Sequence, residues 1–121
     1  MLSGGPLGAE KYAFSQFHFH WGSGNGWGSE HTLNGFSYSG EVHFVTYNSR
    51  YESQAKACEN TDGLAVLGIL IELGGKNAEL EEIINTLDKI RYKGETVTGL
   101  KPVHLEKLLP EYLLPCTTLN F

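Results

Sequence analysis

Three histidines lie in two segments of the chain in which polar and apolar residues alternate. In Gln-Phe-His-Phe-His-Trp at 16–21, an extended strand would place His18 and His20 on one face. The third, His43, lies in Glu-Val-His-Phe-Val at 41–45. Three imidazoles with a fourth position open for water form a common catalytic zinc site. On spacing alone, histidines of ordinary amphipathic strands are an equal alternative.

Two polar side chains are placed to orient these imidazoles. A metal-bound histidine usually donates its second N–H to a carboxylate, amide or carbonyl, and this bond fixes its tautomer. Gln16 comes two residues before His18, and Glu41 comes two residues before His43, so each would share a face with its histidine. We therefore expect both to accept hydrogen bonds from the neighbouring imidazole. For Glu41, a solvated strand position is the alternative.

The remaining candidates carry less specific signals. Glu30 is either a functional carboxylate or a loop charge, and His31, beside a turn, is expected to be a hydrogen-bonded core histidine. His104 follows Pro102 in a helical turn and is expected at the surface. We expect neither of these two histidines to bind zinc. A cupin also places His-x-His on a strand, but it needs a glutamate a few residues later, whereas Glu30 follows His20 across a glycine-rich loop.

Three strands are expected to position these residues. Segments 12–21 and 39–47 alternate with period two, and the continuous apolar run 64–71 is typical of a strand buried on both faces. The aromatic residues on the second face of the first strand are expected to anchor it on a hydrophobic core. These are Phe17, Phe19 and Trp21.

The other segments predict loops and a few helices. The glycine-rich stretch 22–28 is expected to be a connection, and Asn34-Gly35 predicts a hairpin turn of type I′. Apolar residues at helical spacing predict a helix over about 80–90, and a further helical turn is expected at 104–109. Strands followed by helices predict a mostly β fold of the α+β kind, largely antiparallel.

Composition limits the classes of function. The 121 residues fit one domain, and a net charge of -5 without a run of Lys or Arg argues against a nucleic-acid or anionic membrane partner. Cys58 and Cys116 lack CxxC spacing, which excludes a zinc knuckle, and they either pair or are free. No apolar run is long enough to span a bilayer. We expect a small-molecule partner.

Four motifs in one order make the pattern specific. With this order and spacing the chain resembles the α-class carbonic anhydrases along almost its whole length. The resemblance implies the central part of that family's twisted antiparallel sheet with peripheral helices, so that residues 1–121 form a partial α-carbonic anhydrase domain. The motifs are Gln-Phe-His-Phe-His-Trp-Gly at 16–22, Gly-Ser-Glu-His-Thr at 28–32, Glu-Val-His-Phe-Val at 41–45 and Asp-Gly-Leu-Ala-Val-Leu at 62–67.

The resemblance implies a zinc enzyme that reversibly hydrates carbon dioxide to bicarbonate and a proton. His18, His20 and His43 would hold the zinc, with Gln16 and Glu41 orienting them. In this family zinc lowers the pKa of its bound water to about 7, and the resulting hydroxide attacks carbon dioxide. Sulfonamides and anions are the expected inhibitors.

The resemblance also assigns roles beyond the ligands. Val45 and Val66 would belong to a hydrophobic wall for carbon dioxide, and Glu30 would be a catalytic residue. In the family, the glutamate at this place accepts a hydrogen bond from a threonine that orients the hydroxide. That threonine belongs to a Ser-Leu-Thr-Thr-Pro-Pro segment, which these 121 residues lack, and Thr117-Thr118 stands in different surroundings.

The family's proton-shuttling histidine has no counterpart in this sequence either. We therefore expect the chain to be the middle of a longer enzyme, with weak or no activity in isolation. The alternative is a catalytically inactive, carbonic-anhydrase-like module that binds zinc or a partner. Three short segments resemble the secreted and membrane-anchored members more than the cytosolic ones, and the localisation stays open.

Overall fold

The computed structural model describes residues 1–109. They form two compact units, Met1–Leu73 and residues 74–109. The predictions that concern Cys116 and Thr117-Thr118 lie outside the described residues. Among residues 1–109, no helix has the length and apolar character needed to cross a membrane.

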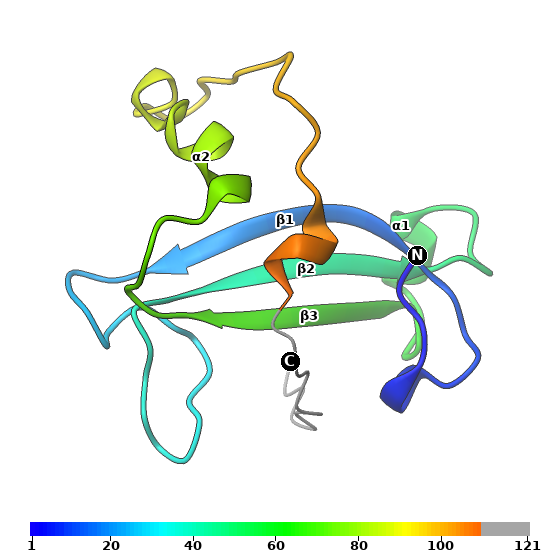
Figure 1. Ribbon diagram of the computed structural model, residues 1–121. Coiled ribbons are helices and arrows are strands. Elements are labelled where there is room, and N and C mark those ends of the chain that lie inside the picture. The colour runs from blue at the N-terminus through cyan, green and yellow to red at the C-terminus, as the bar shows by residue number, and fades with distance from the viewer. Residues whose placement is uncertain (110–121) are drawn as a thin grey trace. The chain divides into compact units, whose positions relative to one another are not determined.

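The first unit is built on an antiparallel sheet of three strands in the order β1-β2-β3 (Figure 1). β1 covers Tyr12–Trp21, β2 covers Gly40–Asn48 and β3 covers Leu64–Ile71. The ranges predicted for β1 and β3 are confirmed, and β2 begins and ends one residue later than predicted. The mostly β, antiparallel fold class is confirmed.

Two short helices complete this unit. η1 is a 3-10 helix over Gly5–Leu7, and α1 covers Gln54–Ala57 between β2 and β3. The side chain of Ser53 accepts a hydrogen bond from the Lys56 N–H and so caps the first turn of α1. α1 contacts β2, and its Ala57 is fully buried.

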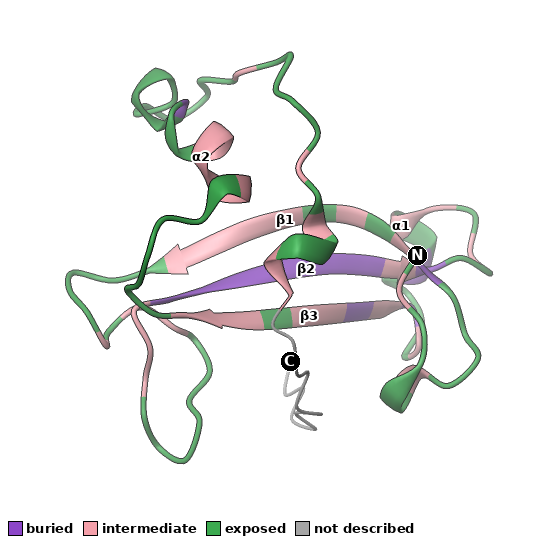
Figure 2. Cartoon of the chain, in the orientation of Figure 1, coloured by how far each residue is buried: buried purple, intermediate pink, exposed green. Residues whose placement is uncertain are grey.

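The central strand β2 is the buried element of the sheet (Figure 2). Every residue from 40 to 46 is buried, because β2 has a neighbouring strand on each side. The prediction that β3 is buried on both faces is wrong, since Ala65 alone is buried within it. β3 lies at the edge of the described sheet, and an apolar run cannot distinguish an edge strand from a central one.

A β-bulge near Ser15 changes the phase of β1. Phe14 pairs with Thr46, whereas Gln16 pairs with Val45, so one residue of β1 is left over between them. Cross-strand partners share a face, so the bulge moves Phe14 to the face that carries Phe17. Their ring centroids are 6.5 Å apart. Simple alternation along 12–21 would have put Phe14 on the opposite face.

That apolar face is formed by aromatic and branched side chains of β1 and β2. The rings of Phe17 and Phe44 lie 6.0 Å apart, and Val42 and Phe44 are buried. The prediction that Trp21 anchors β1 on the core is wrong, because Trp21 is 79% exposed. It is the last residue of β1 and lies opposite Gly40, which offers no side chain to pack against.

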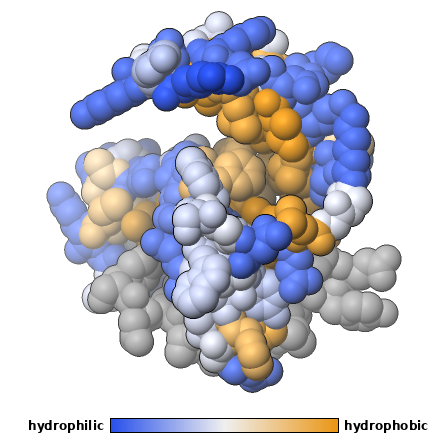
Figure 3. Space-filling view, turned by 90° about the vertical axis from the view of Figure 1, so that its left-hand side faces the viewer, coloured by the Kyte–Doolittle hydropathy of each residue, from blue (hydrophilic) through white to orange (hydrophobic). Residues whose placement is uncertain are grey.

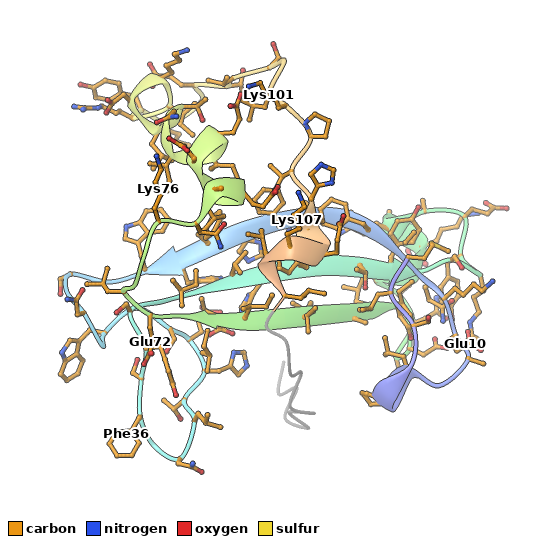
Figure 4. All side chains as sticks on the ribbon, in the orientation of Figure 1. Glu10, Phe36, Glu72, Lys76, Lys101 and Lys107 are labelled. Atoms are coloured by element: carbon orange, nitrogen blue, oxygen red, sulfur yellow. The ribbon has the colours of Figure 1, made fainter. Side chains whose placement is uncertain are left out.

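The loop from 22 to 39 carries the predicted type I′ turn. Asn34 and Gly35 both have positive φ, at 53° and 81°. Two hydrogen bonds join Leu33 and Phe36 across the turn, each at 3.0 Å. Phe36 lies at the tip and points away from the sheet (Figure 4). The turn therefore sends this part of the chain back toward the sheet.

The second unit contains α2, which covers Ala78–Ile84 and is capped by the Asn77 side chain, an acceptor for the Glu79 N–H at 3.0 Å. The continuous helix predicted to Ile90 is wrong. The Thr86 hydroxyl donates to the Ile83 carbonyl oxygen at 2.7 Å, a side-chain bond that competes with helical backbone bonding. The chain continues as a 3-10 helix, η2, over Leu87–Lys89.

The predicted helical turn near residue 104 is present as the 3-10 helix η3, Leu105–Leu108. The Glu79 carboxylate of α2 accepts from the His104 N–H at 3.2 Å and from Lys107 Nζ at 2.8 Å. The His104 side chain is exposed, as predicted.

Hydrophobic side chains also reach the surface on the face drawn in Figure 3.

We predict that Phe44→Ala lowers the free energy of unfolding by about 3–5 kcal/mol, because it removes a buried ring from the centre of the apolar face. The matched control is Phe36→Ala, whose ring is 73% exposed and which should change stability by less than about 0.5 kcal/mol. Urea unfolding followed by circular dichroism measures both. Equal losses in the two variants would contradict this assignment of the core.

Candidate metal centre

The register of β1 and β2 brings three histidines together. His18 lies directly opposite His43, and His20 lies two residues further along the same face of β1. The three ring centroids are 4.6 to 5.3 Å apart. One ring nitrogen from each of the three lies within 4.8 Å of the others. These three residues are called the histidine cluster below.

Two of the imidazoles have their tautomer set by a hydrogen bond. His18 Nδ1 is 2.9 Å from the amide oxygen of Gln16, and His43 Nε2 is 2.8 Å from Glu41 Oε1. Both partners are acceptors, so each of these nitrogens carries the proton. The opposite nitrogens, His18 Nε2 and His43 Nδ1, therefore present lone pairs, as metal ligands must.

The third imidazole contains a buried nitrogen without a partner. Among the described residues, His20 Nε2 is the buried side-chain polar atom that makes no hydrogen bond. Buried polar atoms are nearly always paired, so an unpaired one requires an explanation. The other ring nitrogen, Nδ1, lies 3.4 Å from Glu30 Oε1. His20 Nε2 is thus available to a group that protein atoms do not supply.

The Glu41 carboxylate is buried and accepts four hydrogen bonds on this face of the sheet. Its side chain is 2% exposed. Oε1 accepts from His43 Nε2 at 2.8 Å and from His31 Nδ1 at 2.7 Å, and Oε2 accepts from two backbone N–H groups. The N–H of Glu30 donates at 3.0 Å and the N–H of His31 at 2.8 Å. The carboxylate therefore joins β2 to the loop that precedes it.

These bonds also determine the charge of Glu41. Burial by itself would raise the pKa of this carboxyl. The hydrogen bonds from the His31 backbone N–H and from the His43 and His31 side chains oppose burial and hold the pKa below its ordinary value. Glu41 is therefore an acceptor at neutral pH, and the alternative of a solvated strand position is wrong.

His31 contributes to this network from the loop. Its Nδ1 and its backbone N–H both bond Glu41, so the expectation of a hydrogen-bonded histidine is confirmed. The expectation that it lies in the core is wrong, since its side chain is 48% exposed. The two backbone N–H groups were not identified from the sequence, because every non-proline residue has an N–H and only the folded loop shows where it points.

Glu30 lies over the histidine cluster from the loop side. Its carboxylate is 53% exposed, with Oε1 at 3.4 Å from His20 Nδ1 and Oε2 at 3.9 Å from His43 Nδ1. The backbone N–H of Glu30 is fixed by Glu41, and this bond holds the residue beside the two imidazoles. Its position is therefore next to the cluster, whereas its carboxylate remains open to solvent.

Val45 and Val66 are cross-strand partners on the same face as His43. Val45 follows His43 by two residues in β2 and lies opposite Val66 of β3. Val45 is 8% exposed, and Val66 is half-buried. An apolar surface thus begins at the Val45–Val66 pair, which is the next pair on this face after His43 and its partner Gly68.

A second group of potential ligands overlaps the first. Nitrogen and oxygen atoms of His31, Glu41 and His43 also lie within 4.8 Å of one another. In this group both imidazoles are within 2.8 Å of Glu41 Oε1, as expected for hydrogen bonds. Its atoms therefore already satisfy one another, which distinguishes it from the histidine cluster.

The donor set of the cluster fits zinc. Neutral imidazole nitrogens are preferred ligands of Zn²⁺, and three of them leave a coordination position open. In two of the imidazoles, the hydrogen bond to Gln16 or Glu41 leaves the lone pair on the opposite ring nitrogen. The third imidazole has a buried nitrogen without a partner. This arrangement can bind a transition metal and keep it accessible to a small molecule.

Comparison with known proteins places the chain in one family. The sequence model of eukaryotic-type carbonic anhydrases matches residues 1–115. Carbonic anhydrase 1 of Mus musculus is 47% identical over 116 residues, which cover 93% of this chain and 43% of the relative.

Two other relatives give the same result. Carbonic anhydrase 3 of Bos taurus is 45% identical over 95 residues, covering 78% of this chain and 36% of the relative. The mitochondrial carbonic anhydrase 5A of Rattus norvegicus is 43% identical over 110 residues, which cover 90% of this chain and 36% of the relative. The chain thus spans 36 to 43% of the length of these three relatives. It belongs to the eukaryotic-type carbonic anhydrase family.

Proposed function

We propose that residues 1–121 are part of one α-carbonic anhydrase domain, and that they supply its zinc ligands. The reaction is the reversible hydration of carbon dioxide to bicarbonate and a proton. The ligands are His18, His20 and His43. The observation that carries this proposal is the buried His20 Nε2, which has no partner and lies in the cluster where two other imidazoles present lone pairs.

The chain's own residues prepare the site for the metal. Gln16 and Glu41 hold His18 and His43 in the tautomers that a metal requires, so binding needs no change of tautomer at these rings. Bound zinc would act as a Lewis acid that makes water a nucleophile near neutral pH. Because the three imidazoles are neutral, they would leave the metal its full charge.

Glu30, Val45 and Val66 have supporting roles in this proposal. The Glu30 carboxylate lies beside two of the ligands and is open to solvent, where it can accept a hydrogen bond from a group near the open coordination position. Val45 and Val66 offer an apolar surface on the same face. Carbon dioxide has no net charge and few hydrogen-bonding demands, so an apolar wall suits it.

A second candidate is a carbonic-anhydrase-like module that binds zinc without catalysis. The feature that discriminates it from the catalytic candidate is whether a Ser-Leu-Thr-Thr-Pro-Pro segment, which carries the family's threonine partner for Glu30, follows Phe121 in the parent protein. The two candidates share the metal site and differ in turnover. Sulfonamides and anions are proposed inhibitors of the catalytic form.

We predict that His43→Ala abolishes zinc binding, since it removes the ligand from β2 and leaves two on β1. Competition with a chromophoric chelator measures the zinc dissociation constant. The matched control is His104→Ala, because His104 is exposed and outside the cluster. The zinc affinity of this control should equal that of the unsubstituted chain. Unchanged zinc binding in His43→Ala would rule out the proposed ligand set.

We predict that Glu41→Ala weakens zinc binding by about 10- to 100-fold, because His43 loses the acceptor that fixes its tautomer. The control is Glu52→Ala, whose carboxylate is 80% exposed and pairs with Lys56 on the surface. Circular dichroism checks that both variants fold. If Glu41→Ala binds zinc as tightly as the control, Glu41 has no orienting role.

We predict slow or undetectable carbon dioxide hydration by the isolated 121-residue chain loaded with zinc, because Glu30 lacks its threonine partner. Stopped-flow measurement with a pH indicator gives the rate. Hydration at a rate typical of the family, blocked by a sulfonamide, would contradict this prediction and support the catalytic candidate for the chain alone.

A further inference from the structure

Gly68 occupies a special position in β3. It is the direct cross-strand partner of His43 and stands in the middle of an otherwise apolar strand. Its φ is not positive, so the backbone at this position does not require glycine for its conformation. Glycine within a strand weakens it, and it often marks a place where another group approaches closely.

The group that approaches Gly68 is the Glu41 carboxylate. A Cβ placed on Gly68 would lie 2.6 Å from Glu41 Oε1, closer than Cβ atoms approach other atoms in proteins. The same Cβ would lie 3.5 Å from His43 Cδ2 and 3.7 Å from Glu41 Cδ. The carboxylate therefore occupies the space that any side chain at position 68 would need.

Glu41 cannot move aside without losing its partners. Oε1 is the atom that accepts from both His43 Nε2 and His31 Nδ1. Oε2 is held by the two backbone N–H groups of the loop. A displacement large enough to admit a methyl group would lengthen the bond to His43, which sets the tautomer of that imidazole.

Other tightly packed glycines in this unit behave differently. A Cβ on Gly40 would meet the backbone oxygen of His20 at 2.9 Å, and one on Gly63 would meet the backbone oxygen of Ala57 at 1.7 Å. Those two glycines permit backbone segments to approach each other. Within the described sheet, the close neighbour of Gly68 is instead a side-chain oxygen that orients a histidine of the cluster.

We propose that Gly68 is a positioning residue for the metal centre. The missing side chain leaves the room in which the Glu41 carboxylate bonds His43 Nε2 and keeps the lone pair on His43 Nδ1. This inference rests on the proposed zinc function for its effect on metal binding. β3 thus contributes to the site because Gly68 has no Cβ atom.

The first test is the zinc affinity of Gly68→Ala in the 121-residue chain, with Gly74→Ala as the matched control. Gly74 has ordinary φ, and a Cβ there would meet nothing within 4 Å. We expect Gly68→Ala to weaken zinc binding by about 10- to 100-fold, as for loss of an orienting partner, and the control to leave it unchanged. Equal affinity in the two variants would overturn the inference.

The second test asks whether Gly68 acts through Glu41. In a Glu41→Asp background the side chain is one methylene shorter and is expected to leave room for a methyl group at position 68. Adding Gly68→Ala should then weaken zinc binding by less than about threefold. Such non-additivity indicates direct contact. The same loss in both backgrounds would mean that Gly68 affects the strand generally and would overturn the inference. If Gly68→Ala does not fold, recovery of folding by Glu41→Asp supports the contact, and failure to recover contradicts it.

The third test needs no metal. Imidazole ¹⁵N NMR shifts of the metal-free chain report which nitrogen of His43 carries the proton, and we expect the Nε2–H form in the unsubstituted chain and its loss in Gly68→Ala. Retention of this form in Gly68→Ala would overturn the inference. If the unsubstituted chain has this tautomer and Gly68→Ala loses it, but neither binds zinc, the proposed function fails while the effect of Gly68 on the His43 tautomer is supported.

Discussion

The first unit depends on one buried carboxylate. Glu41 is nearly inaccessible to water and receives four N–H groups, two from imidazoles and two from the backbone of the loop. A buried carboxylate without such partners would be very costly, so the loop and β2 must be in place together. The bonds that offset burial also lower the pKa of Glu41 and fix the proton on His43. The fold and the proposed metal centre therefore share the same interactions.

Much of the sheet could be predicted because its signals are local. The alternation in 12–21, the apolar run 64–71 and the Asn34-Gly35 pair each specify a structure within a few residues. The errors arose where tertiary context decides. The bulge near Ser15 changes which residues of β1 share a face, and no residue type near it indicates a bulge. Trp21 is exposed because its partner across the sheet is a glycine.

In the candidate site, too, the relations within one strand could be predicted and the contacts between distant segments could not. Spacing of two residues within a strand placed Gln16 beside His18 and Glu41 beside His43, since that relation is fixed by strand geometry. The loop amides that bond Glu41, the approach of Glu30 to two imidazoles and the space at Gly68 come from contacts between segments far apart in sequence. The close packing at Gly68 has one sequence signal, an isolated glycine within an apolar strand, which does not identify the atom that it accommodates.

The single loop that joins β1 to β2 has a consequence for stability. His18 and His43, together with the residues that orient them, belong to one contiguous hairpin that spans 16–43. A two-stranded hairpin is marginally stable by itself in water, so these two strands need a further contact to hold them together. In the proposed zinc-bound form, a metal ion held by all three imidazoles would bridge the two strands and stabilise this hairpin. Zinc would then contribute to the stability of the hairpin as well as to its chemistry.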